Sequence, residues 1–281
     1  YIIKKVSAGG DLPRQIANAH TVFNVFTTIL LLPFIKYFAK ICERMIPVKS
    51  EKIKYQYLEP HLLDSPPIAL TQTAYALRRM LQKAWKMVNC TLNFYNRNDE
   101  KNQSILRQIE KREADIDERQ KNITDYLWQL MERKLNDQEA AQIPLLLHCT
   151  NDVERIGDHA LAIHKIFLAM ESDGLKFSDR AQREYDALHD KLAEMASYCA
   201  EMLTESTTEL RKKTMEIYSE FTSLVTTVES EHISRINNGE CKPQVGLVYL
   251  KLLSEFRKIA RHLRNINERA EVFYDNFKIK Q

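Results

Sequence analysis

The side chains that could do chemistry together are concentrated in NDVERIGDHALAI, residues 151–163. In chain order this stretch holds Asp152, Glu154, Arg155, Asp158 and His159. On an α-helix, residues separated by three, four or seven positions share one face, so such side chains can converge. Carboxylates gathered on one face repel one another unless a cation joins them. The stretch therefore predicts either a cation-binding face or a dense ion-pair network.

A second acidic pair strengthens the first of these hypotheses. Glu113 and Asp117 are four residues apart and share a helical face. Antiparallel packing of two helices would bring this pair close to Asp152, Asp158 and His159. We take all five residues as the candidate metal ligands. Carboxylates suit Mg²⁺, Mn²⁺, iron or Ca²⁺, and the histidine favours a transition metal such as iron, Mn²⁺ or Zn²⁺. The alternative is a salt-bridge network with no metal, in which Arg155 bridges Asp158 and its neighbours.

Composition indicates which elements must position these residues. The 281-residue chain has only 6 Gly and 8 Pro, too few for an all-β or Gly-loop fold, so we expect an all-α protein. A formal net charge of +3 does not favour nucleic acid as a partner. The 5 cysteines include no CxxC pair, which favours a reducing environment and argues against a zinc knuckle.

Apolar periodicity predicts six amphipathic helices after Pro67. We expect the first to end near Asn96, the second to follow a cap at Asp99 and the third to follow a cap at Asp137. The loop at Gly174 separates the third from the fourth, and a charged region at 204–213 separates the fourth from the fifth. The sixth is expected to run from Pro243 to about Phe277.

These helices are predicted to form two three-helix repeats, 66–172 and 178–279. At an offset of 103 residues, Ile156 aligns with Ile259, His159 with His262 and Ile163 with Ile266. The same offset aligns Glu113 with Glu216 and Asp117 with Glu220. In the second repeat, Lys258 and Arg261 replace Arg155 and Asp158. We therefore expect Lys258 and Arg261 to neutralise Glu216 and Glu220 without a metal.

The N-terminal part has a different character. Residues 21–35 carry no charge, and we predict a membrane helix over 16–46, with residues 1–46 ending a membrane domain. A buried helix of a water-soluble protein is the alternative. Basic residues on the C-terminal flank place the rest of the chain in the cytoplasm. Four prolines between positions 47 and 67 indicate a linker over 47–65, followed by a domain at 66–281. Because the first residue is Tyr1, we expect the chain to begin within a longer protein.

Two segments resemble known families. VERIGDHA, together with a three-helix repeat, resembles the PhoU domain, a pair of three-helix bundles linked to phosphate regulation. RQIANAHTVFNVFTTILLLPF resembles the segment that ends the membrane part of bacterial sodium/phosphate cotransporters, several of which carry a PhoU-like C-terminal domain. The resemblance implies part of a sodium-dependent transporter of inorganic phosphate in the inner (plasma) membrane, with a regulatory domain in the cytoplasm. Sodium, phosphate and the membrane are then the partners, nucleic acid is not, and a homodimer is the oligomer to test.

The resemblance carries over residue by residue. PhoU proteins have an acid-xxx-Arg-xx-Asp signature that can hold metal clusters, and Arg155 and Asp158 match it. The leading acid is replaced by Asn151, which weakens the first site. In the second repeat the signature is lost, because Ser254, Lys258 and Arg261 occupy its positions. His20 and Asn24 match an AH-xxx-N pattern of the transporter segment; polar packing between membrane helices is their alternative role.

Two other functions compete with this one. A stand-alone PhoU-like signalling scaffold would leave the apolar segment unexplained. A helical-bundle metalloenzyme is suggested by Asp186-x-x-His189 and Glu229-x-x-His232, which resemble di-iron ligand spacing. The sequence contains no nucleophile–base set and no P-loop, so we do not expect an enzyme.

Overall fold

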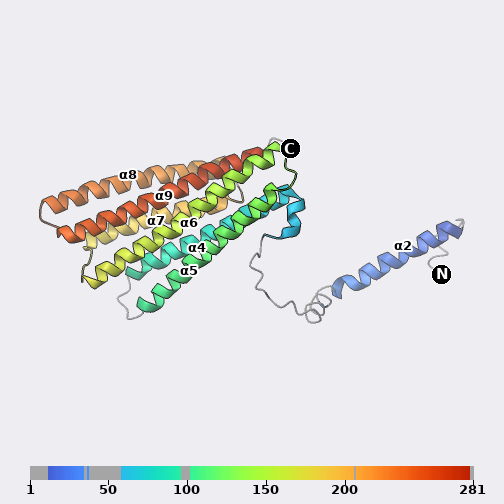
Figure 1. Cartoon of the computed structure of the whole chain (residues 1–281), viewed down its shortest axis with the longest axis horizontal. Coiled ribbons are helices and arrows are strands. Elements are labelled where there is room, and N and C mark those ends of the chain that lie inside the picture. Colours follow the sequence, from blue (N-terminus) through green and yellow to red (C-terminus); the bar gives the residue numbers. More distant parts are fainter. Residues whose placement is uncertain (1–11, 35–36, 38–57, 96–101, 206, 279–281) are drawn as a thin grey trace. The chain divides into compact units, whose positions relative to one another are not determined.

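The computed structural model describes residues 12–34, 37, 58–95, 102–205 and 207–278. Within these ranges every regular element is a helix and there is no strand, which confirms the all-α fold class (Figure 1). The chain divides into two units, Tyr1–Lys54 and Tyr55–Gln281. The predicted cap Asp99 and most of the predicted linker lie outside the described residues.

The first unit contains helix α2 (Leu12–Leu31) followed by the short 3-10 helix η1 (Leu32–Phe34). Its stretch Ile16–Phe34 is long and apolar enough to cross a membrane by length and composition, and none of it is buried. At 1.5 Å per residue its 19 residues span about 28 Å, close to the hydrocarbon thickness of a bilayer. The predicted helix over 16–46 is thus described through Phe34 and at Tyr37.

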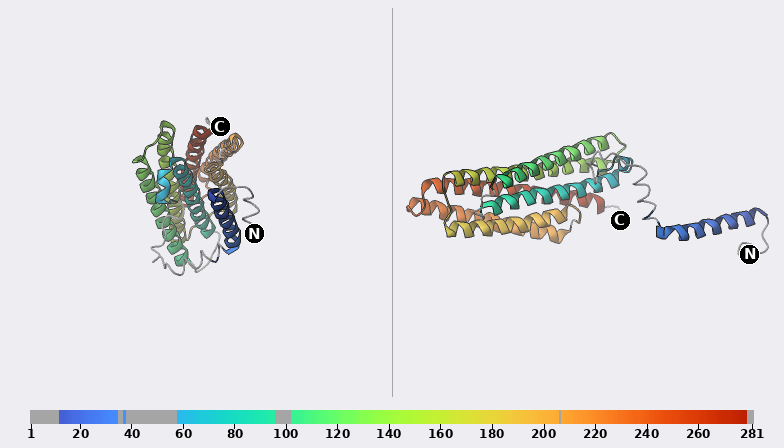
Figure 2. Two further views of the ribbon diagram at one scale, coloured as in Figure 1. Left: turned by 90° about the vertical axis from the view of Figure 1, so that its right-hand side faces the viewer. Right: turned by 90° about the horizontal axis from the view of Figure 1, so that it is seen from below.

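The second unit is a bundle of six long helices. They are α4 (Pro66–Tyr95), α5 (Asn102–Met131), α6 (Asp137–Ser172), α7 (Asp179–Met202), α8 (Thr208–Asn237) and α9 (Pro243–Lys278). Helices α4, α5 and α6 pack on one another, as do α7, α8 and α9 (Figures 1 and 2). The broadest contact of the unit joins α6 to α9. The predicted pair of three-helix repeats is therefore present.

Local sequence explains where these helices begin and end. Asn136 caps α6 and forms a capping box with Glu139, one residue before the predicted cap Asp137. Gly174 ends the first repeat with a φ of 62°, and Gly239 ends α8 with a φ of 75°. The C-terminal end of the predicted linker packs against the bundle. Leu58 and Leu63 are buried there, and Leu63 belongs to the 3-10 helix η2 (Pro60–Asp64).

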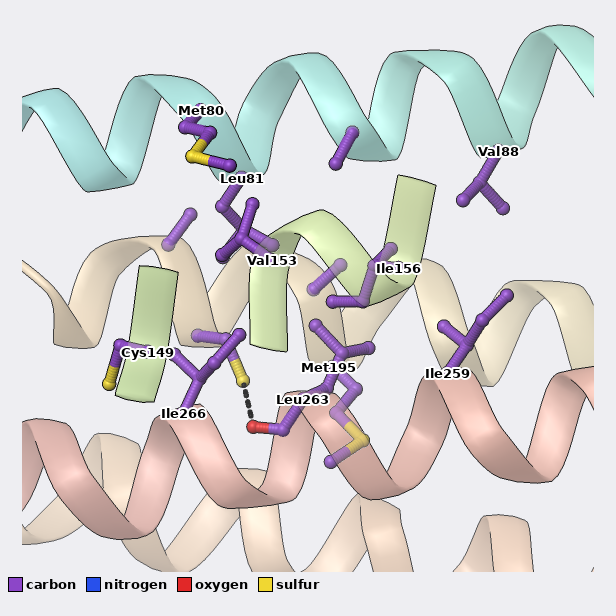
Figure 3. Packing of buried hydrophobic residues seen from close by; sticks show 14 of the residues in the cluster. Met80, Leu81, Val88, Cys149, Val153, Ile156, Met195, Ile259, Leu263 and Ile266 are labelled. Carbon is purple, nitrogen blue, oxygen red and sulfur yellow. Dashed lines mark hydrogen bonds between the residues drawn. The ribbon is translucent and has the colours of Figure 1, made fainter. Parts of the chain in front are cut away.

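The repeats correspond most closely in their third helices. Val153, Ile156 and Ile163 of α6 are buried, as are Phe256, Ile259 and Ile266 of α9, which lie 103 residues later. Figure 3 shows α4, α6, α7 and α9 contributing side chains to this shared core. The offset of 103 residues is therefore confirmed for α6 and α9.

The second helices follow a different offset. The buried residues Ile109, Ile116 and Ile123 of α5 match Thr214, Phe221 and Val228 of α8, 105 residues later. The two-residue difference rotates the alignment by about 200°. The predicted equivalence of Glu113 with Glu216 and of Asp117 with Glu220 is therefore wrong. The residues that correspond to Glu113 and Asp117 are Tyr218 and Thr222, which carry no carboxylate.

Helices α8 and α9 approach closely at Gly246. A Cβ atom at this position would lie 2.5 Å from Cδ1 and 2.8 Å from Cγ1 of Ile236. We expect Gly246→Ala to lower the free energy of unfolding by about 1–2 kcal/mol, because overpacking outweighs the gain in helix propensity. Urea unfolding measures the change.

Gly157→Ala is the matched control, since its new Cβ would meet Ile116 Cδ1 at 3.2 Å, where a small shift suffices. We expect this variant to be close to neutral. Equal losses in the two glycine variants would contradict the packing described at Gly246.

Candidate functional site

The charged residues at 152–159, which we call the charged turn of α6, do not form one face. Their side chains point to two different neighbouring helices. Glu154 and Asp158 are four residues apart and face α5. Asp152 and His159 are seven residues apart and face α9. The six-residue step from Asp152 to Asp158 turns the helix by about 240°, so these two carboxylates cannot share a site. The predicted set of five metal ligands is therefore divided.

The first face gathers carboxylates from two helices, and we call it the acid face. It consists of Glu113 and Asp117 on α5 and Glu154 and Asp158 on α6. Partial burial, followed by the charges of Asp117 and Asp158, raises the pKa of Glu113. Burial and Asp158 raise the pKa of Asp117. Burial and the same Asp158 also raise the pKa of Glu154. Repulsion from neighbouring carboxylates thus adds to burial in raising these three pKa values.

Arg155 relieves part of this repulsion, as predicted. Its Nη1 donates to Asp158 Oδ2 at 2.9 Å, and its Nε lies 3.5 Å from Glu154 Oε2. The Arg155 side chain is mostly exposed, so water weakens both attractions. One arginine thus offsets part of a cluster of four carboxylates.

The donor chemistry of the acid face suits a hard cation, which carboxylate oxygens would bind. In the described parts of the chain, however, no three His, Cys, Asp or Glu side chains converge closely enough to hold an ion as they stand. A cation would have to draw Glu113, Asp117, Glu154 and Asp158 together. Metal binding here remains a proposal, and Asp152 and His159 are not among its ligands.

The second face of α6 forms a buried polar contact with α9. Asp152 is only 8% exposed. Its Oδ1 accepts from His262 Nδ1 at 2.6 Å and from Asn265 Nδ2 at 3.4 Å. Its Oδ2 accepts from Arg269. The carboxylate is thus surrounded by donors from α9, which makes it a structural ion-pair partner.

A second pair repeats this arrangement with the roles of the helices exchanged. His159 Nδ1 of α6 lies 2.7 Å from Glu255 Oε2 of α9. Glu255 and His262 follow Asp152 and His159 by the same 103 residues, so each helix gives one carboxylate and one histidine. The two imidazole rings stack with centroids 5.4 Å apart. We call these two pairs the crossed His–carboxylate pairs; they join the repeats across antiparallel helices.

The second repeat has no counterpart of the acid face among its described residues. Glu216 pairs with Lys212 at 3.7 Å, and Glu220 pairs with Lys191 of α7 at 2.5 Å. Lys258 instead donates to Glu255 at 2.7 Å. The prediction that Lys258 neutralises these two glutamates is therefore wrong. At the offset of 103, Arg257 and Arg261 take the places of Glu154 and Asp158.

The motifs that suggested a metalloenzyme have other partners. His189 Nε2 lies 2.8 Å from Asn89 Oδ1, and its ring stacks on Trp85. His232 is buried against Tyr249, and Glu229 pairs with Arg257 at 2.6 Å. Nothing in this arrangement supports a di-iron site.

His20 and Asn24, the polar residues of the transporter-like segment, lie on α2. Both side chains are exposed within the first unit.

Sequence reasoning missed three contributors. Glu154 is not among the predicted metal ligands, although its spacing to Asp158 equals that of Glu113 to Asp117. The crossed pairs could have been found from the offset of 103, which aligns Asp152 with Glu255 as well as His159 with His262. A row of cations on α4 could have been found from the helical spacing of Arg79, Lys83 and Lys86.

Both the sequence and the structure are similar to those of known proteins. Residues 77–166, which contain the acid face, match the family model of the PhoU domain. The structure resembles the crystal structure of PhoU from Pseudomonas aeruginosa, with a TM-score of 0.65 and 18% identity over 72% of this chain and 95% of that one. It also resembles the phosphate transport system regulatory protein PhoU from Streptococcus pneumoniae, with a TM-score of 0.59 and 15% identity over 75% of this chain and 97% of that one. No curated protein matches the sequence.

The six-helix unit therefore has a PhoU-like fold, and its first repeat carries the PhoU domain match. This agrees with the resemblance carried by VERIGDHA.

Proposed function

We propose that the chain is the regulatory end of a sodium-dependent transporter of inorganic phosphate. In this proposal α2 lies in the plasma membrane as the last span of a multi-pass membrane domain, and the six-helix unit lies in the cytoplasm. The unit regulates transport or phosphate signalling and catalyses no reaction. Sodium and phosphate are handled by the membrane domain.

The observation that carries the proposal is the presence of both parts in one chain. The PhoU-like fold links the six-helix unit to proteins named as PhoU, one of them a phosphate transport system regulatory protein. The same chain holds an apolar helix of membrane-spanning length whose large side chains, including Phe23, Phe26 and Ile29, are exposed. Exposed apolar surface of this extent is costly in water and favourable in lipid.

Membrane association is tested by fractionating cells that express residues 1–281. We expect the protein in the membrane pellet, released by detergent and not by high salt. Phe26→Lys combined with Ile29→Lys should move most of it to the soluble fraction, because lysine near the centre of a span is costly. Leu247→Lys is the matched control: Leu247 is 61% exposed on α9, against 64% for Phe26 on α2. A wild-type chain that stays soluble without detergent would contradict the membrane role.

Regulation requires a second experiment in cells that carry the gene. Sodium-dependent uptake of radiolabelled phosphate is measured over a range of external phosphate concentrations. Removal of residues 66–278 should leave uptake in place but abolish its response to external phosphate. Unchanged regulation after this deletion would overturn the proposal.

A stand-alone PhoU-like scaffold is the second candidate function, supported by the fold alone. A soluble chain that still alters phosphate-dependent gene expression would favour this candidate.

A further inference from the structure

A groove on the side of α4 concentrates positive charge. Its volume is about 570 Å³, and we call it the basic groove. It is lined by Tyr75, Arg78, Arg79, Gln82, Lys83 and Lys86 of α4 and by Arg119 of α5. Five of these seven residues are cations. The net charge of the whole chain is only +3, so this local concentration of cations comes from where these residues lie and not from the overall composition.

Asp115 of α5 offsets part of this charge. It pairs with Lys83, and Arg119 Nε lies 3.3 Å from it. These pairs lower the pKa of Asp115, although burial opposes them. Arg78 Nη1 donates to the neutral Thr204 Oγ1 at 2.6 Å. Asp115 thus pairs with two of the five cations, whereas the hydrogen bond of Arg78 goes to a neutral hydroxyl.

The cations follow one face of α4. Arg79, Lys83 and Lys86 are spaced by four and three residues, so they form a row about 10 Å long. Like charges at this spacing destabilise a helix by a few tenths of a kcal/mol per pair. Asp115 already offsets the charge of Lys83 in the middle of the row, and an anion laid along the row would add to that relief. The spacing of the row therefore favours an extended anion over a single point charge.

On α5, the carboxylates of the acid face and the residues beside the basic groove lie on opposite sides. Glu113 and Asp117 belong to the acid face, whereas Asp115 and Arg119 border the basic groove. The two-residue step between Glu113 and Asp115 turns the helix by about 200°. An anion in the groove is thus held away from the carboxylates of the acid face.

We propose that the basic groove binds an anion with two or more phosphate groups. Arginine guanidinium groups pair with phosphate oxygens in a bidentate manner, and lysines add point charges. The Tyr75 hydroxyl and the Gln82 amide supply neutral donors beside them. A row of about 10 Å matches a short phosphate chain and is too short for the contacts of a nucleic-acid duplex. The inference deepens the proposed function, on which its regulatory meaning rests, by naming a ligand through which phosphate status reaches the domain.

The test is calorimetric titration of the full chain in a non-ionic detergent with tripolyphosphate, inorganic phosphate and sulfate. We expect tripolyphosphate to bind most tightly and its affinity to fall as salt rises. Lys83→Gln combined with Lys86→Gln should weaken tripolyphosphate binding by about tenfold. Lys111→Gln combined with Lys121→Gln removes the same charge from positions of α5 outside the groove and should change affinity by less than about twofold. Circular dichroism melts confirm that both double variants are folded.

A comparison of two probes identifies the source of the phosphate groups. Soluble short-chain cardiolipin, which carries two phosphate groups, represents a lipid headgroup, and tripolyphosphate represents a free anion. Binding of either probe that is lost in the Lys83/Lys86 variant supports the groove, and the tighter one names the source. Equal weakening in both double variants, or no binding of either probe, would overturn the inference, as would an oligonucleotide that binds more tightly than both.

These outcomes are separate from those of the proposed function. Binding by the purified chain without any effect of residues 66–278 on uptake would overturn the transporter role and leave the groove assigned. Regulated uptake without anion binding would support the transporter role and overturn the assignment of the groove as an anion site.

Discussion

Asp152→Asn is expected to lower the free energy of unfolding of the six-helix unit by about 3 kcal/mol, because removing one partner of a buried ion pair strands the other. The carboxylate is buried and accepts from His262, Asn265 and Arg269. A neutral amide cannot match the charge of Arg269, and it presents a donor to groups that are themselves donors. For a unit of this size the melting temperature should fall by about 6–12 °C. Urea unfolding in the presence of EDTA gives the free energy.

Asp158→Asn is the matched control, six residues further along the same helix. Asp158 lies on the acid face, where it raises the pKa values of Glu113, Asp117 and Glu154. Removing its charge relieves repulsion, although it also weakens the pair with Arg155. We expect a change within about 0.5 kcal/mol, in the stabilising direction. Similar losses in the two variants would contradict the division of the charged turn into two faces.

Addition of a divalent cation is expected to stabilise the chain through the acid face alone. At a hundred times its dissociation constant, a bound ion raises the free energy of unfolding by about 2.7 kcal/mol. Thermal melts in EDTA, Mg²⁺, Mn²⁺, Zn²⁺ and iron(II) measure the effect and rank the ions. The physical reason is that an ion replaces the repulsion among four carboxylates with attraction.

The effect of the cation should depend on pH with a definite sign. Because the folded-state pKa values of Glu113, Asp117 and Glu154 are raised, ionisation of these groups destabilises the fold at neutral pH. That destabilisation disappears as the pH falls through the raised values, where protons occupy the oxygens that the metal would bind. The metal-dependent shift should therefore be larger at pH 7.5 than at pH 5.

Variants locate the site of the ion. Glu154→Gln combined with Asp158→Asn should abolish the metal-dependent shift, whereas Glu220→Gln in the second repeat should preserve it. A shift that survives the first pair of substitutions would place the ion elsewhere. The absence of any shift in the parent protein would leave Arg155, with the more distant charge of Lys165 on Glu113, as the relief of the acid face.

The helices and the pairing of the repeats could be predicted from spacing along the chain. Apolar residues at three- and four-residue steps, with few glycines and prolines, favour long helices. The start of α6 follows from local hydrogen-bonding rules to within one residue, since Asn136 is the cap and Asp137 is the predicted one. The alignment of His159 with His262 held because the buried faces of α6 and α9 repeat in register. These features depend on neighbours along the chain, so they can be derived from spacing.

Which charges meet depends on how the helices pack, and spacing along the chain does not predict it. The offset of 103 residues fails for α5 and α8, because the register between packed helices is set by how their side chains interdigitate and not by sequence spacing. For this reason Glu216 and Glu220 are not counterparts of Glu113 and Asp117. Spacing also placed Asp152 beside Asp158, whereas a turn of about 240° directs one carboxylate to the donors of α9 and the other to the acids of α5. The same packing brings Arg119 of α5 beside the lysines of α4, a neighbourhood that requires two helices and that no single segment of the chain contains.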